Sequence, residues 1–263
     1  MTHDKGETIF SSIEPELIKR ITRREAFAKV FKFGAVAASA PLALGVLSQA
    51  TFGQSAALPQ QIIDVLNFAL TLEYLEAEFY ELGTKADNLV PRETREVFNT
   101  LRDHEAAHVK LLKSTLGAKA VAKPTFDFTA GGAFADAFKN YQTFLALSQA
   151  FEDTGVRAYK GQATNLMSNG LILQTALQIH SVEARHAAEV RRIRGEKEWI
   201  TGNSRGTLPA PTQPVYNGDE NTVQGGIDFK GAGGTPPSAA TETFDEPLTK
   251  PQVLAIVKPF IRG

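Results

Sequence analysis

Hydrophobic residues recur every three to four positions between Pro59 and Gly195, which is the spacing of amphipathic helices. The pattern predicts four long helices: Gln60 to Leu82, ended by Gly83; Pro91 to Leu116, ended by Gly117; about Thr143 to Ala163; and Asn169-Gly170 to Gly195. Proline suits the first position of a helix, and glycine commonly follows its last turn. The expected fold class is therefore all-α, with a four-helix bundle as its main part.

One connection in this bundle is much longer than the others. It runs from Ala118 to about Gln142, contains Pro124, Gly131 and Gly132, and is expected to hold a short helix around Phe134 to Asn140. Two short connections flanking a long one predict two helical hairpins that are joined by a crossover.

A loop-rich tail follows the bundle. Of the 34 Gly and Pro residues, 17 lie between Thr201 and Gly263. Thr249, Pro251 and the apolar residues 253–257 predict a short capped helix in this tail, packed on the bundle or on a partner subunit. The sequence thus divides into three predicted regions: residues 1–50, the bundle at 51–200 and the tail at 201–263.

Residues 1–50 have the pattern of an export signal. Basic residues, with Arg23-Arg24 among them, precede a short apolar run from Phe33 to Leu47 and small residues near Ala50. Arg23-Arg24 followed by Phe27 resembles the twin-arginine signal, which implies a periplasmic or extracellular protein. A retained anchor and a buried helix of the mature fold are the alternatives, although the run of about 15 residues is short for a membrane span.

Charge and composition exclude several classes of protein. The formal net charge is -1, and because residues 1–50 hold 7 basic and 5 acidic side chains, the rest of the chain has 21 against 24. Without a basic excess we expect no nucleic-acid partner, and after signal removal no membrane partner. The absence of cysteine excludes thiolate metal sites, so any metal must be held by carboxylates and imidazoles.

Each predicted helix places one glutamate on its hydrophobic stripe. With two histidines one turn further along, the candidate metal ligands are Glu73, Glu105, His108, Glu152, Glu183 and His186. A buried carboxylate must be protonated, paired or metal-bound, and no basic side chain shares these stripes. Two divalent cations would balance four carboxylates, and Glu-x-x-His places both donors on one helix face.

The spacing of these residues indicates an internal duplication. Glu73 and Glu105 are 32 residues apart, and Glu152 and Glu183 are 31 apart. In both halves a tyrosine, Tyr80 or Tyr159, follows the first glutamate by seven positions. These tyrosines could bond the ligand carboxylates, act as redox-active neighbours, or simply pack in the core.

Other residues near the stripes leave alternatives open. Glu76 could be an extra ligand or face water with the other glutamates of its helix. Gly155 stands at the matching position of the third helix, where a small residue could leave an opening for peroxide or dioxygen. Asp103 and Asp153 could accept hydrogen bonds from the imidazoles. His104 and His180 are expected beside the cluster or at the surface.

The segments LNFALTLEYLEAEFYELG, DHEAAHVKLL, FEDTGVRAYKG and HSVEARHAAEVRRIRG resemble the ferritin-like domain family that includes exported and desiccation-related bacterial proteins. The tail segments VYNGDENT and FDEPLTKPQVLAIVKPF resemble that family too. A glutamate from each of two helices and Glu-x-x-His from each of the other two is the ligand set of its di-iron and di-manganese members.

The resemblance implies an exported protein with two divalent ions, Fe or Mn, and redox handling of dioxygen or peroxide, or iron(II) oxidation, in stress protection. If it is an enzyme, it would be a ferroxidase or resemble manganese catalase. The alternative is a non-catalytic metal-binding or structural protein. The expected partners are metal ions and small oxygen species, and a homo-oligomer could form.

Overall fold

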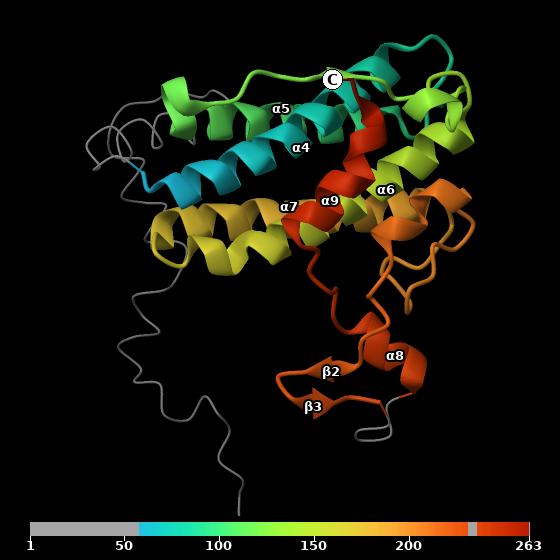
Figure 1. Ribbon diagram of the computed structural model, residues 1–263. Coiled ribbons are helices and arrows are strands. Elements are labelled where there is room, and N and C mark those ends of the chain that lie inside the picture. Colours follow the sequence, from blue (N-terminus) through green and yellow to red (C-terminus); the bar gives the residue numbers. More distant parts are fainter. Residues whose placement is uncertain (1–57, 231–235, 263) are drawn as a thin grey trace, which may run out of the picture. The chain divides into compact units, whose positions relative to one another are not determined.

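The computed structural model describes residues 58–230 and 236–262 (Figure 1). The expected export signal, with Arg23-Arg24, lies outside the described residues. Among the helices that are described, none combines the length and apolar character needed to cross a membrane.

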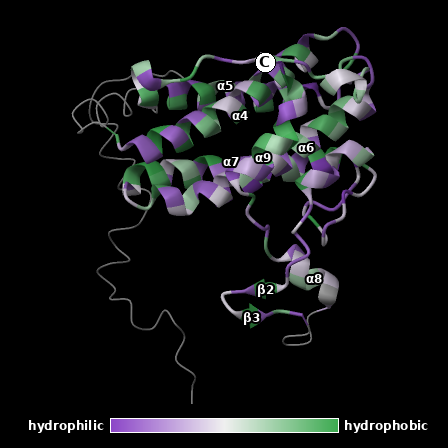
Figure 2. Ribbon diagram, viewed as in Figure 1, coloured by the Kyte–Doolittle hydropathy of each residue, from purple (hydrophilic) through white to green (hydrophobic). Residues whose placement is uncertain are grey.

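Four long helices form the bundle, and the all-α prediction is confirmed. They are α4 (Gln60–Lys85), α5 (Arg95–Leu116), α6 (Tyr141–Gln162) and α7 (Gly170–Ile193). Helix α4 packs mainly against α5 and α6 against α7, as two hairpins do. Figure 2 shows hydrophobic and hydrophilic residues interspersed along each of these helices, as expected for amphipathic elements with a shared core.

The helix boundaries differ from the prediction at two places in the first hairpin. Helix α4 runs through Gly83 to Lys85, because this buried glycine accommodates the ring of Phe144, which a Cβ would overlap. Pro91 opens a turn in which the N–H of Thr94 bonds to its carbonyl, and α5 starts only at Arg95. The side chains of Asn140 and Asn169 cap the starts of α6 and α7.

The crossover contains no α-helix, so the one expected at Phe134 to Asn140 is wrong. It contains η1 (Gly117–Lys119), β1 (Thr125–Phe126), η2 (Ala130–Gly132) and turns. Phe134 and Ala137 are buried, and Phe134 stacks on Phe260 of the tail. Tertiary packing, rather than helical hydrogen bonding, holds this segment.

The tail has short elements. After η3 (Ala163–Leu166) and α7 come η4 (Ala210–Val215), β2 (Val223–Gln224), β3 (Ile227–Asp228), α8 (Pro237–Glu242), α9 (Lys250–Val257), η6 (Lys258–Phe260) and β4 (Ile261–Arg262). Strand β4 pairs antiparallel with β1, and β2 with β3. Helix α9 is the expected capped helix: the side chain of Gln252 accepts from the N–H of Thr249.

The tail packs on α6 around a buried arginine. Arg157 donates to the backbone carbonyls of Val215, Asn217 and Glu246 and lies 3.6 Å from Asp219. One turn along, a Cβ on Gly161 would overlap the carbonyl oxygen of Leu248. The tail therefore covers the outer face of α6, and 17 of the 22 residues of this helix are buried.

Candidate metal centre

The structure brings the six predicted ligand residues into one buried cluster inside the bundle. Their side chains come from all four long helices: Glu73 from α4, Glu105 and His108 from α5, Glu152 from α6, and Glu183 and His186 from α7. The four glutamates are fully buried, and the histidines are at most 9% exposed. Helix periodicity turns each of these residues inward, because each lies on the hydrophobic stripe of its helix.

The cluster divides into two overlapping groups of donors. One group is Glu73, Glu105, His108 and Glu183, and the other is Glu105, Glu152, Glu183 and His186. In each group one donor atom from every residue lies within 4.8 Å of all the others. Glu105 and Glu183 belong to both groups, which is the arrangement expected of carboxylates placed between two metal positions.

Several donor atoms have no hydrogen-bond partner among the described residues. They are Oε1 of Glu105, Oε2 of Glu152, both carboxylate oxygens of Glu183, and Nδ1 of His186. His186 Nδ1 does lie 2.9 Å from Glu105 Oε1 and 3.2 Å from Glu152 Oε2, but neither approach has hydrogen-bond geometry. Within the cluster, Nδ1 of His108 does form hydrogen bonds, at 3.1 Å from Glu73 Oε2 and from Glu105 Oε2. Buried polar atoms normally have partners, so the remaining unpartnered donors fit a site for cations.

The two tyrosines bond across the halves of the bundle. Tyr80 of α4 donates its hydroxyl hydrogen to Glu152 Oε1 of α6, and Tyr159 of α6 donates to Glu73 Oε1 of α4. Burial, reinforced by the neighbouring carboxylate, raises the pKa of both tyrosines well above the usual value. Both hydroxyls therefore stay protonated and remain donors.

The electrostatics show a strong negative field at the cluster. Burial raises the pKa of Glu152 to about 7 despite its contact with His186, and burial raises the pKa of Glu105 as well. Burial alone would lower the pKa of His186, yet Glu152 and Glu105 raise it to about 12. The field that holds protons on the imidazoles is the field that would attract divalent cations in their place.

Glu76 is buried beside the cluster, so the alternative that it faces water is wrong, whereas Glu81 on the same helix is half-exposed. Burial, reinforced by the charge of Glu183, raises the pKa of Glu76 well above its usual value. A Cβ on Gly155 would lie 3.3 Å from Glu76 Oε1.

The space beside Gly155 is therefore filled by the carboxylates of Glu76 and Glu183, with no room for a water molecule. The expected opening for peroxide or dioxygen at this position is wrong, because the side chain that faces Gly155 in the other half of the bundle fills it.

The neighbouring histidines differ in their contacts. His104 Nδ1 lies 2.9 Å from His186 Nε2, on the side of the ring opposite the cluster, and the two imidazoles stack. His180 instead contacts the backbone carbonyl of Val156 through Nδ1.

Asp103 and Asp153 contact arginines rather than imidazoles. Asp103 is exposed and pairs with Arg102. Asp153 is buried, pairs with Arg191 and accepts from the hydroxyl of Tyr216. The expectation that the two aspartates would orient the imidazoles is wrong, because their carboxylates form ion pairs with these arginines.

Comparison with known proteins agrees with this arrangement. No curated protein matches the chain. The sequence model described as "Ferritin-like domain" matches residues 61–196, just over half of the chain, and this range holds all four long helices except for the first residue of α4. The buried Glu and His cluster is compatible with a dinuclear metal site. The chain belongs to the ferritin-like domain family.

Proposed function

We propose that this protein holds two divalent ions, iron or manganese, in the Glu and His cluster and uses them in redox handling of dioxygen or peroxide or in iron(II) oxidation. The observation that carries the proposal is the pair of overlapping donor groups sharing Glu105 and Glu183. Carboxylate and imidazole donors suit both metals. When bound, two such ions can exchange two electrons with one oxygen species.

The chain's own residues prepare the site for this chemistry. Four buried carboxylates balance the charge of two divalent cations. The hydroxyls of Tyr80 and Tyr159 each fix one oxygen of a glutamate, which leaves the other oxygen facing the cluster. The surrounding hydrophobic core excludes bulk water and keeps these electrostatic interactions strong.

Metal analysis of site variants tests the proposal. The full chain, purified from medium rich in iron and manganese, should contain two metal ions. Glu105→Gln and Glu183→Gln should each reduce both positions, because these residues belong to both donor groups. Glu73→Gln and Glu152→Gln should each reduce mainly one position. Glu81→Gln, at a half-exposed position on α4 outside both donor groups, is the control.

Activity is measured on the same preparations, as iron(II) oxidation and as oxygen evolution from peroxide. Fewer than one metal ion per folded chain would refute the dinuclear site. Two bound ions with neither reaction would favour the alternative, a non-catalytic metal-binding protein of stress protection.

We also propose that the protein works in the periplasm or outside the cell after twin-arginine export. Arg23-Arg24, the apolar run that follows and the mildly acidic remainder of the chain support this proposal.

A further inference from the structure

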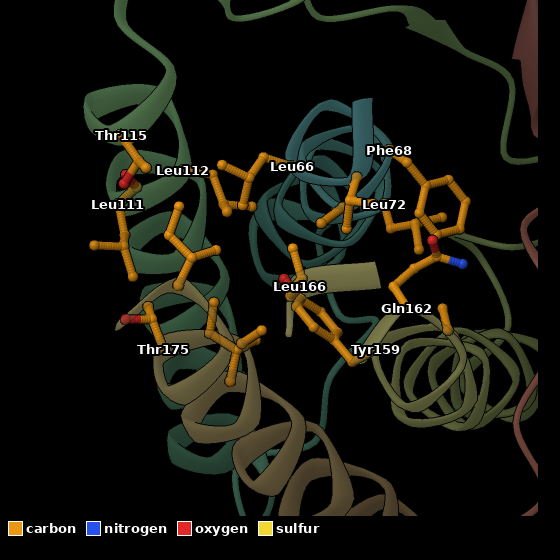
Figure 3. Close-up of a pocket in the computed structure, with 16 residues that line it drawn as sticks. Leu66, Phe68, Leu72, Leu111, Leu112, Thr115, Tyr159, Gln162, Leu166 and Thr175 are labelled. Carbon is orange, nitrogen blue, oxygen red and sulfur yellow. The ribbon is translucent and has the colours of Figure 1, made fainter. Parts of the chain in front are cut away.

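An apolar cavity lies inside the bundle next to the metal-ligand cluster. Figure 3 shows side chains of separate helices around it, among them Leu66 of α4, Leu112 of α5 and Tyr159 of α6. Its free volume is about 30 Å³. This exceeds the roughly 10–15 Å³ that one water molecule needs.

The cavity begins one helical turn from the cluster. Three of its lining residues lie four positions from a cluster residue on the same helix: Ala69 from Glu73, Leu112 from His108, and Ile179 from Glu183. Four residues correspond to about 6 Å along a helix. Tyr159 also lines the cavity while its hydroxyl bonds to Glu73.

The internal duplication explains why the cavity exists. An offset of 79 residues relates Glu73 to Glu152, and one of 78 relates Glu105 to Glu183. Under these offsets three phenylalanines correspond to smaller residues that line the cavity: Phe79 to Ala158, Phe98 to Ala176, and Phe144 to Val65.

The three phenylalanines fill the opposite end of the bundle. Phe79, Phe98 and Phe144 are fully buried, and their ring centroids lie 5.4, 6.2 and 6.3 Å from that of Tyr80. At the Tyr159 end the corresponding side chains are Ala and Val, so the matching space is not filled. The two ends of one pseudo-symmetric site therefore differ in access.

The lining offers few hydrogen-bonding groups to a polar guest. The hydroxyls of Thr115 and Thr175 donate to carbonyls of their own helices, and Tyr159 donates to Glu73. The fourth polar side chain, Gln162, accepts from Asn165 through its amide oxygen, and the rest of the lining is apolar. Hydrogen peroxide and hydrated cations would lose hydrogen bonds to water that aliphatic walls do not replace. An apolar diatomic molecule carries no such cost.

We propose that this cavity binds dioxygen at the Tyr159 side of the cluster and excludes peroxide and metal cations. The choice of dioxygen rests on the proposed function; the affinity of the cavity for a small apolar molecule does not.

Xenon, a small apolar probe, tests the cavity in the metal-free full chain. Crystals under xenon pressure should show one atom bounded by Leu112, Tyr159 and Ala176. Ala176→Phe, which introduces the residue found at Phe98 in the other half, should abolish it. Leu177→Phe, at an exposed neighbouring position, is the control and should retain xenon. If Ala176→Phe does not fold, Val65→Phe replaces it. Absence of xenon from the unmodified chain would overturn the proposal, as would its retention in the folded, filled variant.

Rates of iron(II) oxidation, measured once with dioxygen and once with hydrogen peroxide as the oxidant, test whether the cavity admits dioxygen and excludes peroxide. Ala176→Phe should slow the dioxygen reaction by about tenfold, equivalent to about 1.4 kcal/mol of lost binding, and leave the peroxide reaction unchanged. Equal slowing of both reactions would overturn the assignment to dioxygen. The two proposals fail separately: a chain that holds no metal but takes xenon refutes the proposed function alone, and one that oxidises iron but takes no xenon refutes the cavity alone.

Discussion

Each tyrosine at the cluster occupies one carboxylate oxygen of a glutamate from the other hairpin. Tyr159 bonds Oε1 of Glu73, and Tyr80 bonds Oε1 of Glu152. Glu183 has both oxygens unbonded among the described residues. Glu73 and Glu152 belong to one donor group each, whereas Glu105 and Glu183 are shared between the groups. Of the remaining oxygens, Oε2 of Glu73 and Oε2 of Glu105 contact Nδ1 of His108, and Oε2 of Glu152 has no partner among the described residues. The tyrosines thus fix the orientation of the two unshared carboxylates.

His104 makes the two donor groups inequivalent. It contacts the outer nitrogen of His186, while the residue that corresponds to it beside His108 is Val182. Groups that hold the second nitrogen of a ligating histidine orient the ring toward the metal. We expect His104→Ala to weaken binding at one position, the one served by His186, by about 10–100-fold.

Competition with a chromophoric chelator measures both affinities in the same titration. His104→Asn, which retains a hydrogen-bonding group, should recover part of the loss. His180→Ala removes a histidine that contacts a backbone carbonyl instead, and it should leave both affinities unchanged. An equal loss at the two positions, or the same loss in His180→Ala, would show that His104 acts only on general stability.

The six candidate ligands could be predicted because helical periodicity fixes the direction of each side chain. The burial of Glu76 and the contact of His104 could not, since both depend on how α4, α5, α6 and α7 meet. Spacing places Glu76 one turn from Glu73 and so marks it as a possible ligand, but its burial against Gly155 of α6 follows only from the assembled bundle.

At the scale of elements, glycine has two roles that sequence alone does not separate. Gly117 ends α5 with φ at 55°, in the left-handed region, and was predicted correctly as a stop. Gly83 lies within α4 and provides space for Phe144. In the crossover, the Phe and Ala residues of 134–140 have a helix-like pattern, but Phe134 packs on Phe260 of the tail and Phe138 on Phe79 of α4, which the local sequence does not show.

Gly161 is a second glycine of close approach, and substitution there should release the tail from α6. Because a Cβ would overlap the backbone of Leu248, we expect Gly161→Ala to lower the free energy of unfolding by at least about 1–3 kcal/mol, the usual cost of overpacking. Denaturant melts measure the loss, and limited proteolysis shows whether the tail becomes accessible.

Gly170→Ala is the matched control. Gly170 is the first residue of α7, and a Cβ there meets no atom within 4 Å. Alanine is the better helix former, so this variant should be neutral or more stable by up to about 1 kcal/mol. If both variants melted alike, close packing of Leu248 on α6 would not be what holds the tail.

At the scale of the whole molecule, the proposed twin-arginine export would determine which metal the cluster meets. Carboxylate and imidazole donors bind copper and zinc more tightly than manganese or iron(II) when all are available. Export of the folded chain would allow metal loading in the cytoplasm, away from that competition.

Replacement of the Arg23-Arg24 pair by lysines tests this route. The Arg23→Lys, Arg24→Lys double variant should remain in the cytoplasm, because the twin-arginine signal requires the arginine pair. Arg20→Lys, in the same basic region, should be exported as before. Cell fractionation followed by immunoblotting measures both. Normal export of the double variant would remove the twin-arginine proposal and leave the bundle chemistry untouched.

The crossed tyrosine bonds have a consequence for the ancestry of the fold. Each hairpin supplies a hydroxyl that the other hairpin's glutamate needs, so a half-length chain could not satisfy its own carboxylate. Two copies of such a chain, related by a two-fold axis, would each complete the other. The present chain is then best understood as a fused symmetric dimer, in which duplication allowed the two ends of the site to differ: phenylalanines fill the Tyr80 end, and smaller residues of both hairpins line the Tyr159 end.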